Sequence, residues 1–167
     1  MTVHGRRFAW GSRSYIMGII NLTPDSFSGD GVGADVAAAV ELARRLEAEG
    51  ADILDLGAES SRPSAPELDV REELRRLIPA FEAVRAATNL PISVDTYHVD
   101  TAKAVLAVGA DMINDIWGFR HEKQHGSMAE AVISSKATVI AMHNQRGRAH
   151  TDVASDILRG WRETTAI

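Results

Sequence analysis

The chain has 167 residues, of which 45% are hydrophobic and 25% charged, and its formal net charge is −5. This composition indicates one globular domain without the basic surface that nucleic-acid binding requires. Because the sequence contains no cysteine, disulfides and thiolate metal sites are excluded. No stretch has the character of a signal peptide or the length of a membrane span. We therefore expect a cytoplasmic protein with neither a nucleic-acid nor a membrane partner.

Short apolar runs alternate along the chain with longer amphipathic ones. The first two runs, "RRFAW" and "RSYIMGII", are separated by Gly11 and Ser12, and they predict a small hairpin that leads into a buried strand. Helical spacing of apolar residues predicts helices at 35–50, 69–88, 99–110, 127–136 and 151–166. Further strands are predicted between these helices, at 51–60, 91–96, 111–116 and 137–143.

Two helix boundaries carry local signals. Gly50 follows the first predicted helix and suits its C-terminal cap, because glycine adopts positive φ at little cost. Asp69 precedes the second helix and Glu72 stands three residues later, which is the spacing of a capping box. We therefore expect one helix to end at Gly50 and the next to begin after Asp69.

Five strand–helix steps with buried strands predict an α/β fold in which helices cover a parallel sheet. In such folds the ligand site lies at the carboxyl ends of the strands. Asp95 and Asn114 are flanked there by strand residues, so we expect both to be partly buried and to need polar partners. Other hydrogen-bonding side chains at these ends are Asn21, Thr23, Asp25, Ser26, Asp55, Thr96, Asp115 and those of 59–62 and 142–146.

Five segments carry a resemblance to a known family. In chain order they are "IMGIINLTPDSFS", "GADILDLGAESSRP", "ISVDT", "GADMINDI" and "MHNQRG". Together, over residues 8 to about 165, the sequence resembles dihydropteroate synthase. The resemblance implies a TIM-type (β/α)8 barrel. It also implies a reaction that joins p-aminobenzoate to 6-hydroxymethyl-7,8-dihydropterin diphosphate, releases pyrophosphate and is inhibited by sulfonamides.

The resemblance also implies which residues bind the pterin. Asp95 and Asn114 would read the donors and acceptors on its amino-pyrimidinone edge. Ile116 and Met142 would pack on the pterin ring. His143 either lines the same pocket beside Met142 or has a structural role, and the sequence leaves both possibilities open.

A second group of residues is implied at the diphosphate and the aminobenzoate. Asn21 would meet Mg²⁺, the implied cofactor, together with the diphosphate, since Mg²⁺ takes oxygen ligands and keeps several waters. Ser61 stands where the family usually has threonine, and either hydroxyl can donate to a diphosphate oxygen. Pro63 would lie near the aminobenzoate. The residues implied in catalysis are Asp25, Phe27 and Arg62.

The resemblance implies that residues 21–33 form the family's first mobile loop, which folds over the diphosphate, and that Arg62 and Pro63 belong to its second mobile loop. Two segments in these regions are 24–33 and 61–68. Both are rich in Gly, Pro and Ser with little apolar anchoring, which predicts that they are the least ordered internal segments. The remaining histidines show no metal-ligand spacing with acidic residues and are expected at the surface. They are His4, His98, His121, His125 and His150.

The length of the chain limits how much of the barrel it can form. A (β/α)8 barrel takes about 250 residues and at least about 200. We therefore expect a single pterin-binding domain over residues 1–167, truncated at its C-terminus, with about five of the eight βα units. The family's lysine, second carboxylate and anion-binding groups on later strands would lie beyond it, so the activity of the short chain is an open question. The full-length family is expected to be homodimeric.

Two alternative readings are open. The chain could be a non-catalytic fragment or truncated homologue that binds pterin or assembles with another chain. It could also be a pterin-binding methyltransferase domain, which shares the barrel and the Asp/Asn readout but uses methyltetrahydrofolate. The segments "ESSRP" and "MHNQRG" favour the synthase.

Overall fold

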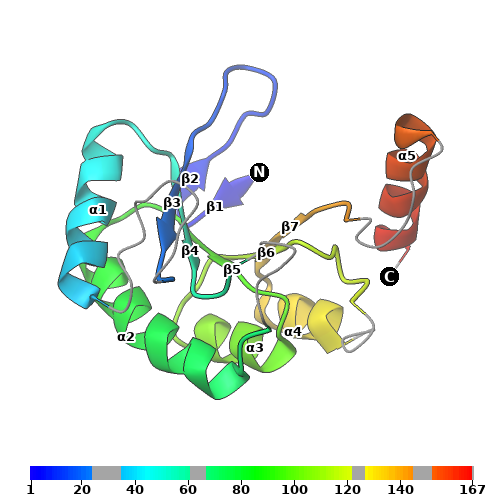
Figure 1. The fold of residues 1–167 in the computed structure, drawn as a ribbon. Coiled ribbons are helices and arrows are strands. Elements are labelled where there is room, and N and C mark those ends of the chain that lie inside the picture. Colours follow the sequence, from blue (N-terminus) through cyan, green and yellow to red (C-terminus); the bar gives the residue numbers. More distant parts are fainter. Residues whose placement is uncertain (24–34, 61–66, 122–126, 145–151, 167) are drawn as a thin grey trace.

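The computed structural model describes residues 1–23, 35–60, 67–121, 127–144 and 152–166 (Figure 1). Its centre is a five-stranded parallel sheet whose strands are neighbours in chain order. The strands are β3 (Met17–Asn21), β4 (Ile53–Gly57), β5 (Ile92–Asp95), β6 (Met112–Asp115) and β7 (Thr138–Ala141). The predicted parallel α/β arrangement is confirmed, and strands that add on one side in chain order are typical of a barrel wall.

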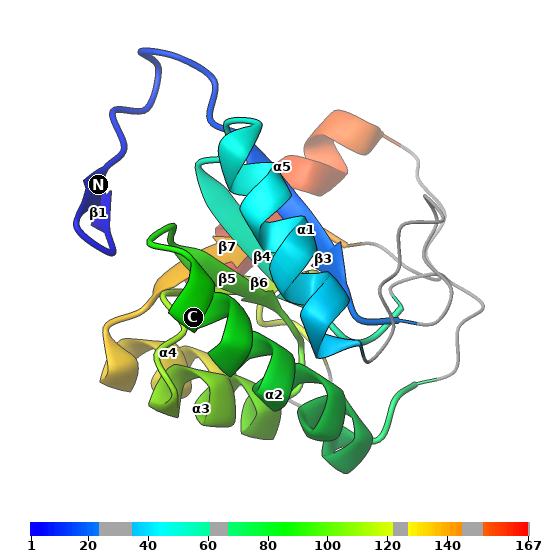
Figure 2. The same ribbon diagram turned by 90° about the vertical axis from the view of Figure 1, so that its left-hand side faces the viewer.

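A helix follows each strand of this sheet. The helices are α1 (Val36–Ala48), α2 (Val70–Ala87), α3 (Val99–Ala107), α4 (Ser127–Ser135) and α5 (Val153–Thr164). The first four pack side by side in a row over one face of the sheet, whereas α5 lies apart from that row beyond β7 (Figures 1 and 2). In the described part of the chain, no helix combines the length and the apolar character needed to cross a bilayer.

The main core lies between the sheet and the row of helices. Leu54, Val94 and Ile113 are fully buried there from the strands, and Leu77 and Phe81 meet them from α2. Successive side chains of a strand point to opposite faces. The residues between these apolar positions therefore face away from the helices, toward what would be the interior of a barrel.

The helix boundaries follow the local signals in the sequence. Gly50 lies just beyond α1 with φ of 101°, as its predicted capping position requires. Asp69 caps α2 by accepting a hydrogen bond from the Arg71 amide. Glu72 instead uses its carboxylate to accept bonds from Arg75 and from Arg76, so those guanidinium groups engage the second side chain of the predicted capping box.

A short N-terminal hairpin is present, as predicted, but its strands pair differently from the prediction. Strand β1 (Thr2–Val3) pairs antiparallel with β2 (Arg6–Arg7) across a two-residue turn. His4 and Gly5 both have positive φ in this turn, at 47° and 72°, which is the conformation that matches the twist of a tight hairpin. The second predicted strand instead forms β3 and pairs parallel with β4.

The hairpin region covers the amino-terminal end of the sheet on the face opposite the helices. Val3 and Phe8 form a second apolar cluster there with Ile53 and Met112, which begin β4 and β6. Tyr15 packs against this cluster and against the Phe8 ring. Because apolar side chains fill this end, the polar side chains on the same face lie toward the carboxyl ends of the strands.

Candidate functional site

One row of the sheet brings the predicted polar residues together at the carboxyl ends of the strands. Asn21 is the register partner of Gly57, Gly57 of Asp95, and Asp95 of Asn114. The neighbouring residues Val94 and Ile113 are buried on the helix side. Asn21, Asp95 and Asn114 therefore share the face that points away from the helices.

Asp95 supplies the carboxyl group of this row, and the pKa of that group is strongly raised. Burial, together with the charges of Asp55, Asp115, Glu73 and Glu59, raises the pKa of Asp95 to about 8. A Cβ at Gly57 would lie 3.4 Å from the Asp95 Cβ, so the glycine leaves this carboxyl group unobstructed on one side. The group is thus a half-buried acid that holds a proton near neutral pH until hydrogen-bond donors favour its ionised form.

The Asn114 carboxamide is held in place by the side chain of a second acidic residue, Asp55. Its Nδ2 donates to Oδ2 of Asp55 at 3.1 Å. Asp55 is 4% exposed, and burial raises its pKa. Oδ1 of Asp55 is buried without a hydrogen-bond partner in the described part of the chain. The pair orients the Asn114 amide on the same face as Asp95.

Asp115 follows Asn114 in the sequence but has a different role. It is fully buried, and its carboxylate accepts hydrogen bonds from the backbone amides of Trp117 and Phe119 at 2.8 and 2.9 Å. These bonds shape the turn after β6, where Gly118 and Phe119 have positive φ. Asp115 therefore supports the loop that follows the strand and is a structural residue.

The remaining predicted residues on described segments lie near the same end of the sheet. Ile116 is half-buried directly after β6, and Met142 follows β7 with 46% of its surface exposed. The Met142 amide donates to the Asp115 carbonyl, which joins the ends of β6 and β7. His143 packs against Gly160 of α5, and its Nδ1 lies 3.2 Å from a guanidinium nitrogen of Arg120.

Several predictions fall on segments outside the described residues. They are the roles of Asp25, Phe27, Ser61, Arg62 and Pro63, the surface positions of His125 and His150, and the predicted low order of 24–33 and of 61–66 within 61–68.

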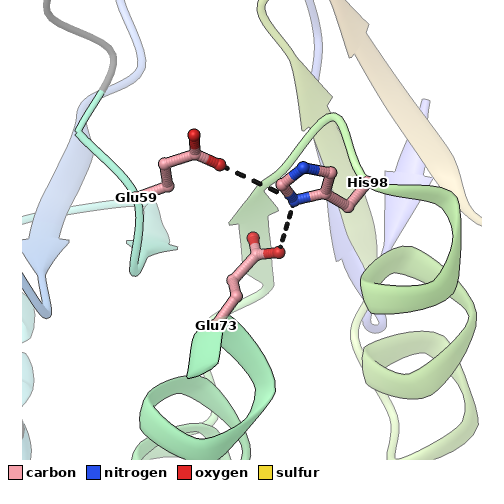
Figure 3. A group of neighbouring side chains, drawn as sticks. All are labelled: Glu59, Glu73 and His98. Carbon is pink, nitrogen blue, oxygen red and sulfur yellow. Dashed lines mark hydrogen bonds and ion pairs between the residues drawn. The ribbon is translucent and has the colours of Figure 1, made fainter. Parts of the chain in front are cut away.

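The structure also reveals a cluster that the sequence interpretation missed. Glu59, Glu73 and His98 converge from the loop after β4, the first turn of α2 and the residue before α3 (Figure 3). The surface prediction for His98 was wrong, since its side chain is only 11% exposed. A usable signal was present: Glu73 lies four residues before buried Leu77, on the apolar face of its helix.

The sequence model of the family described as "Pterin binding enzyme" matches residues 17–164. The dihydropteroate synthase of Clostridium beijerinckii is 37% identical over 167 residues, which cover all of this chain and 61% of that protein. The dihydropteroate synthase of Synechocystis is 42% identical over 136 residues, which cover 81% of this chain and 46% of that protein.

Solved structures of dihydropteroate synthases superimpose closely on this chain. Dihydropteroate synthase from Clostridium difficile, in the presence of pteroic acid, has a TM-score of 0.85 and 40% identity, covering 96% of this chain and 60% of that one. The Yersinia pestis synthase in a sulfonamide drug complex has a TM-score of 0.88 and 32% identity, covering 99% and 61%. The described sheet thus corresponds to part of a TIM-type barrel, as predicted, and the chain spans about half to three fifths of the relatives' length.

Proposed function

This chain belongs to the pterin binding enzyme family, and on that premise we propose that it carries the pterin-recognising part of a dihydropteroate synthase. The proposed reaction joins p-aminobenzoate to 6-hydroxymethyl-7,8-dihydropterin diphosphate. The amine of p-aminobenzoate attacks the methylene carbon, the bond from that carbon to the diphosphate oxygen breaks, and pyrophosphate leaves. The amine loses one proton in the process.

The observation that carries this proposal is the pairing of Asp95 with Asn114 in adjacent strands, on the face away from the helices. A pterin presents a flat edge with ring N–H, amino and carbonyl groups in a fixed order. A carboxylate accepts from the N–H donors, and a carboxamide can both donate and accept. A site that satisfies such a pattern rejects rings that lack it, because its buried polar groups would be left unpaired.

The raised pKa of Asp95 gives this recognition a defined chemistry. Before binding, the half-buried carboxyl group holds its proton near neutral pH. Donors on the pterin edge stabilise the ionised carboxylate and lower its pKa. The side chain therefore exchanges its proton for two ligand hydrogen bonds, and Asp55 keeps the neighbouring Asn114 amide in place.

Asn21 is suited to the diphosphate end of the substrate. Its side chain lies half-buried at the carboxyl end of β3, in the same register row as Gly57 and on the same face as Asp95. One amide oxygen fits Mg²⁺, which often takes few protein ligands and completes its shell with phosphates and waters. Mg²⁺ bound in this way would neutralise charge on the departing pyrophosphate.

Other residues complete the proposed site around the reacting groups. Ile116 and Met142 follow the ends of β6 and β7 and would cover the pterin ring. The proposed contacts to the diphosphate and the aminobenzoate come from residues outside the described segments, namely Asp25, Phe27, Ser61, Arg62 and Pro63.

The proposal also covers the cellular location and the oligomeric state of the protein. Because folate synthesis consumes soluble precursors, we place the protein in the cytoplasm. By likeness to the family we also propose the homodimer that is expected of its full-length members. Cell fractionation and the mass of the protein in solution test these two points independently of catalysis.

Calorimetric titration of the chain with 6-hydroxymethyl-7,8-dihydropterin diphosphate and Mg²⁺ tests the function. We expect saturable binding that weakens about tenfold or more in Asp95→Asn, in line with the loss of one or two hydrogen bonds to a charged group. Asn89→Ala, at an exposed position remote from the row, is the matched control. Binding of methyltetrahydrofolate in preference to the diphosphate would contradict the synthase proposal.

A further inference from the structure

We propose that Glu59, Glu73 and His98 form a binding site for a divalent cation of the zinc type (Figure 3). Each residue comes from a different segment: the loop after β4, the first turn of α2 and the position before α3. The cluster shares no residue with the proposed pterin and Mg²⁺ sites, and it does not depend on the proposed synthase function.

The geometry of the three side chains is compact. One ligand atom from each residue lies within 4.8 Å of the other two. His98 Nδ1 lies 2.8 Å from Glu73 Oε2 and 3.6 Å from Glu59 Oε2. One nitrogen and one oxygen from each carboxylate can converge on a small cation if the proton of the His98–Glu73 hydrogen bond is released.

The electrostatic balance favours such a cation. Glu73 is completely buried, and the side chains of Glu59 and His98 are each only 11% exposed. Two carboxylates and one imidazole therefore share a volume largely closed to water, and Glu67 lies nearby, with its Oε1 3.7 Å from His98 Nε2. A divalent cation bound among them would balance the charges of the two carboxylates.

Two buried oxygens of the cluster also lack a hydrogen-bond donor in the described part of the chain. Glu59 Oε2 and Glu73 Oε1 accept no hydrogen bond within the described residues. Buried polar atoms without partners are unusual in folded proteins and call for a specific explanation. A cation bound between the carboxylates supplies that explanation for both atoms.

The second oxygen of each carboxylate accepts a hydrogen bond from a neighbouring residue, and in Glu73 this is also the oxygen that faces His98. Tyr97 donates its hydroxyl to Glu59 Oε1 at 2.7 Å, and the Leu68 amide donates to the same atom at 3.2 Å. Thr101 donates its hydroxyl to Glu73 Oε2 at 2.6 Å. Such supporting hydrogen bonds are what orients carboxylate ligands in metal sites.

The donor set selects the class of cation. Zn²⁺ binds imidazole nitrogen together with carboxylate oxygen, commonly through three protein ligands and one water. Mg²⁺ and Ca²⁺ prefer oxygen ligands alone. A bound zinc-type ion would join the end of β4 to the starts of α2 and α3, and it would therefore stabilise this end of the fold.

The test uses metal-free protein, dialysed against a chelator, and isothermal titration with Zn²⁺. We expect one saturable site per chain, with affinity reduced about tenfold or more in His98→Ala and in Glu73→Gln. His4→Ala is the matched control, because His4 also contacts a carboxylate, Asp111, but lies at the surface. The affinity of the His4→Ala variant for Zn²⁺ should equal that of the unaltered chain, and Mg²⁺ should not compete with Zn²⁺ for the site.

Two further measurements separate loss of metal binding from loss of folding. Circular dichroism of the metal-free variants shows whether each one folds, and Glu59→Gln replaces any variant that does not. Co²⁺ substitution reports ligand geometry through its visible absorption, which should be lost in the same variants. Absence of saturable Zn²⁺ binding, or equal binding in the cluster variants and in His4→Ala, would overturn the proposal.

Discussion

Asn114 of β6 donates a hydrogen bond to Asp55 of β4 at 3.1 Å, across the intervening strand β5. Their carboxamide and carboxylate meet on the face away from the helices, and the bond fixes which side of the amide is available next to Asp95. The orientation of the Asn114 carboxamide, which we propose to bind the pterin, thus depends on the buried carboxylate of Asp55.

Replacing Asp55 with alanine should therefore weaken pterin binding. The effect would be indirect, through the orientation of Asn114. The Asn114 amide would lose its partner and sample other orientations, for which we expect about tenfold weaker binding, equivalent to about 1.4 kcal/mol. Calorimetric titration with the pterin diphosphate measures the effect. Unchanged affinity in a folded Asp55→Ala variant would show that Asn114 needs no such support.

Pterin affinity should depend on pH through Asp95. Its free pKa is raised to about 8, mainly by burial, and ligand donors lower that pKa in the complex. Between the bound and free pKa values, binding releases a proton, so affinity should rise with pH, by up to about tenfold per unit, and level off above pH 8. Titrations at several pH values in two buffers of different ionisation enthalpy would detect the released proton.

Asp95→Asn provides the control for this pH dependence. The variant cannot ionise at that position, so its affinity should change little across the same range once the titration of the pterin itself has been subtracted. An equally steep pH profile in the variant would assign the effect to another group.

The close approach of α5 to the end of β7 makes a prediction about stability. A Cβ at Gly160 would overlap His143 Nδ1, so Gly160→Ala should displace that ring and lower stability by about 1–3 kcal/mol through overpacking. Alanine is otherwise the better helix former. Adding His143→Ala should recover part of the loss, and urea denaturation of both single variants and the double variant measures the coupling.

A polypeptide of residues 1–167 alone should bind the pterin diphosphate but form no detectable dihydropteroate. By likeness to the family, cationic groups on later strands stabilise the departing pyrophosphate, and removal of even one such donor costs about 3 kcal/mol or on the order of 10²–10³ in rate. A longer version that continues through the remaining βα units should be active. Robust turnover by the shorter polypeptide would contradict this account.

The periodicity of the sequence was sufficient to predict the strands and helices of the main sheet. Apolar residues such as Leu77 and Phe81 recur at helical spacing, and Asp69 marks where their helix begins. Val94 and Ile113 had to be buried, and strand alternation then requires Asp95 and Asn114 to point the other way. Local chemistry carries this information, so it can be read without the tertiary structure.

Contacts between distant segments could not be read in the same way. Asp55 and Asn114 are 59 residues apart, and Glu73 and His98 are 25 apart. Periodicity reports which side of an element is buried, but it does not report which loops meet once α2 has packed against α3. Only the folded chain placed His98 between two carboxylates, because the register of the strands and the packing of the helices together determine which side chains share a buried volume.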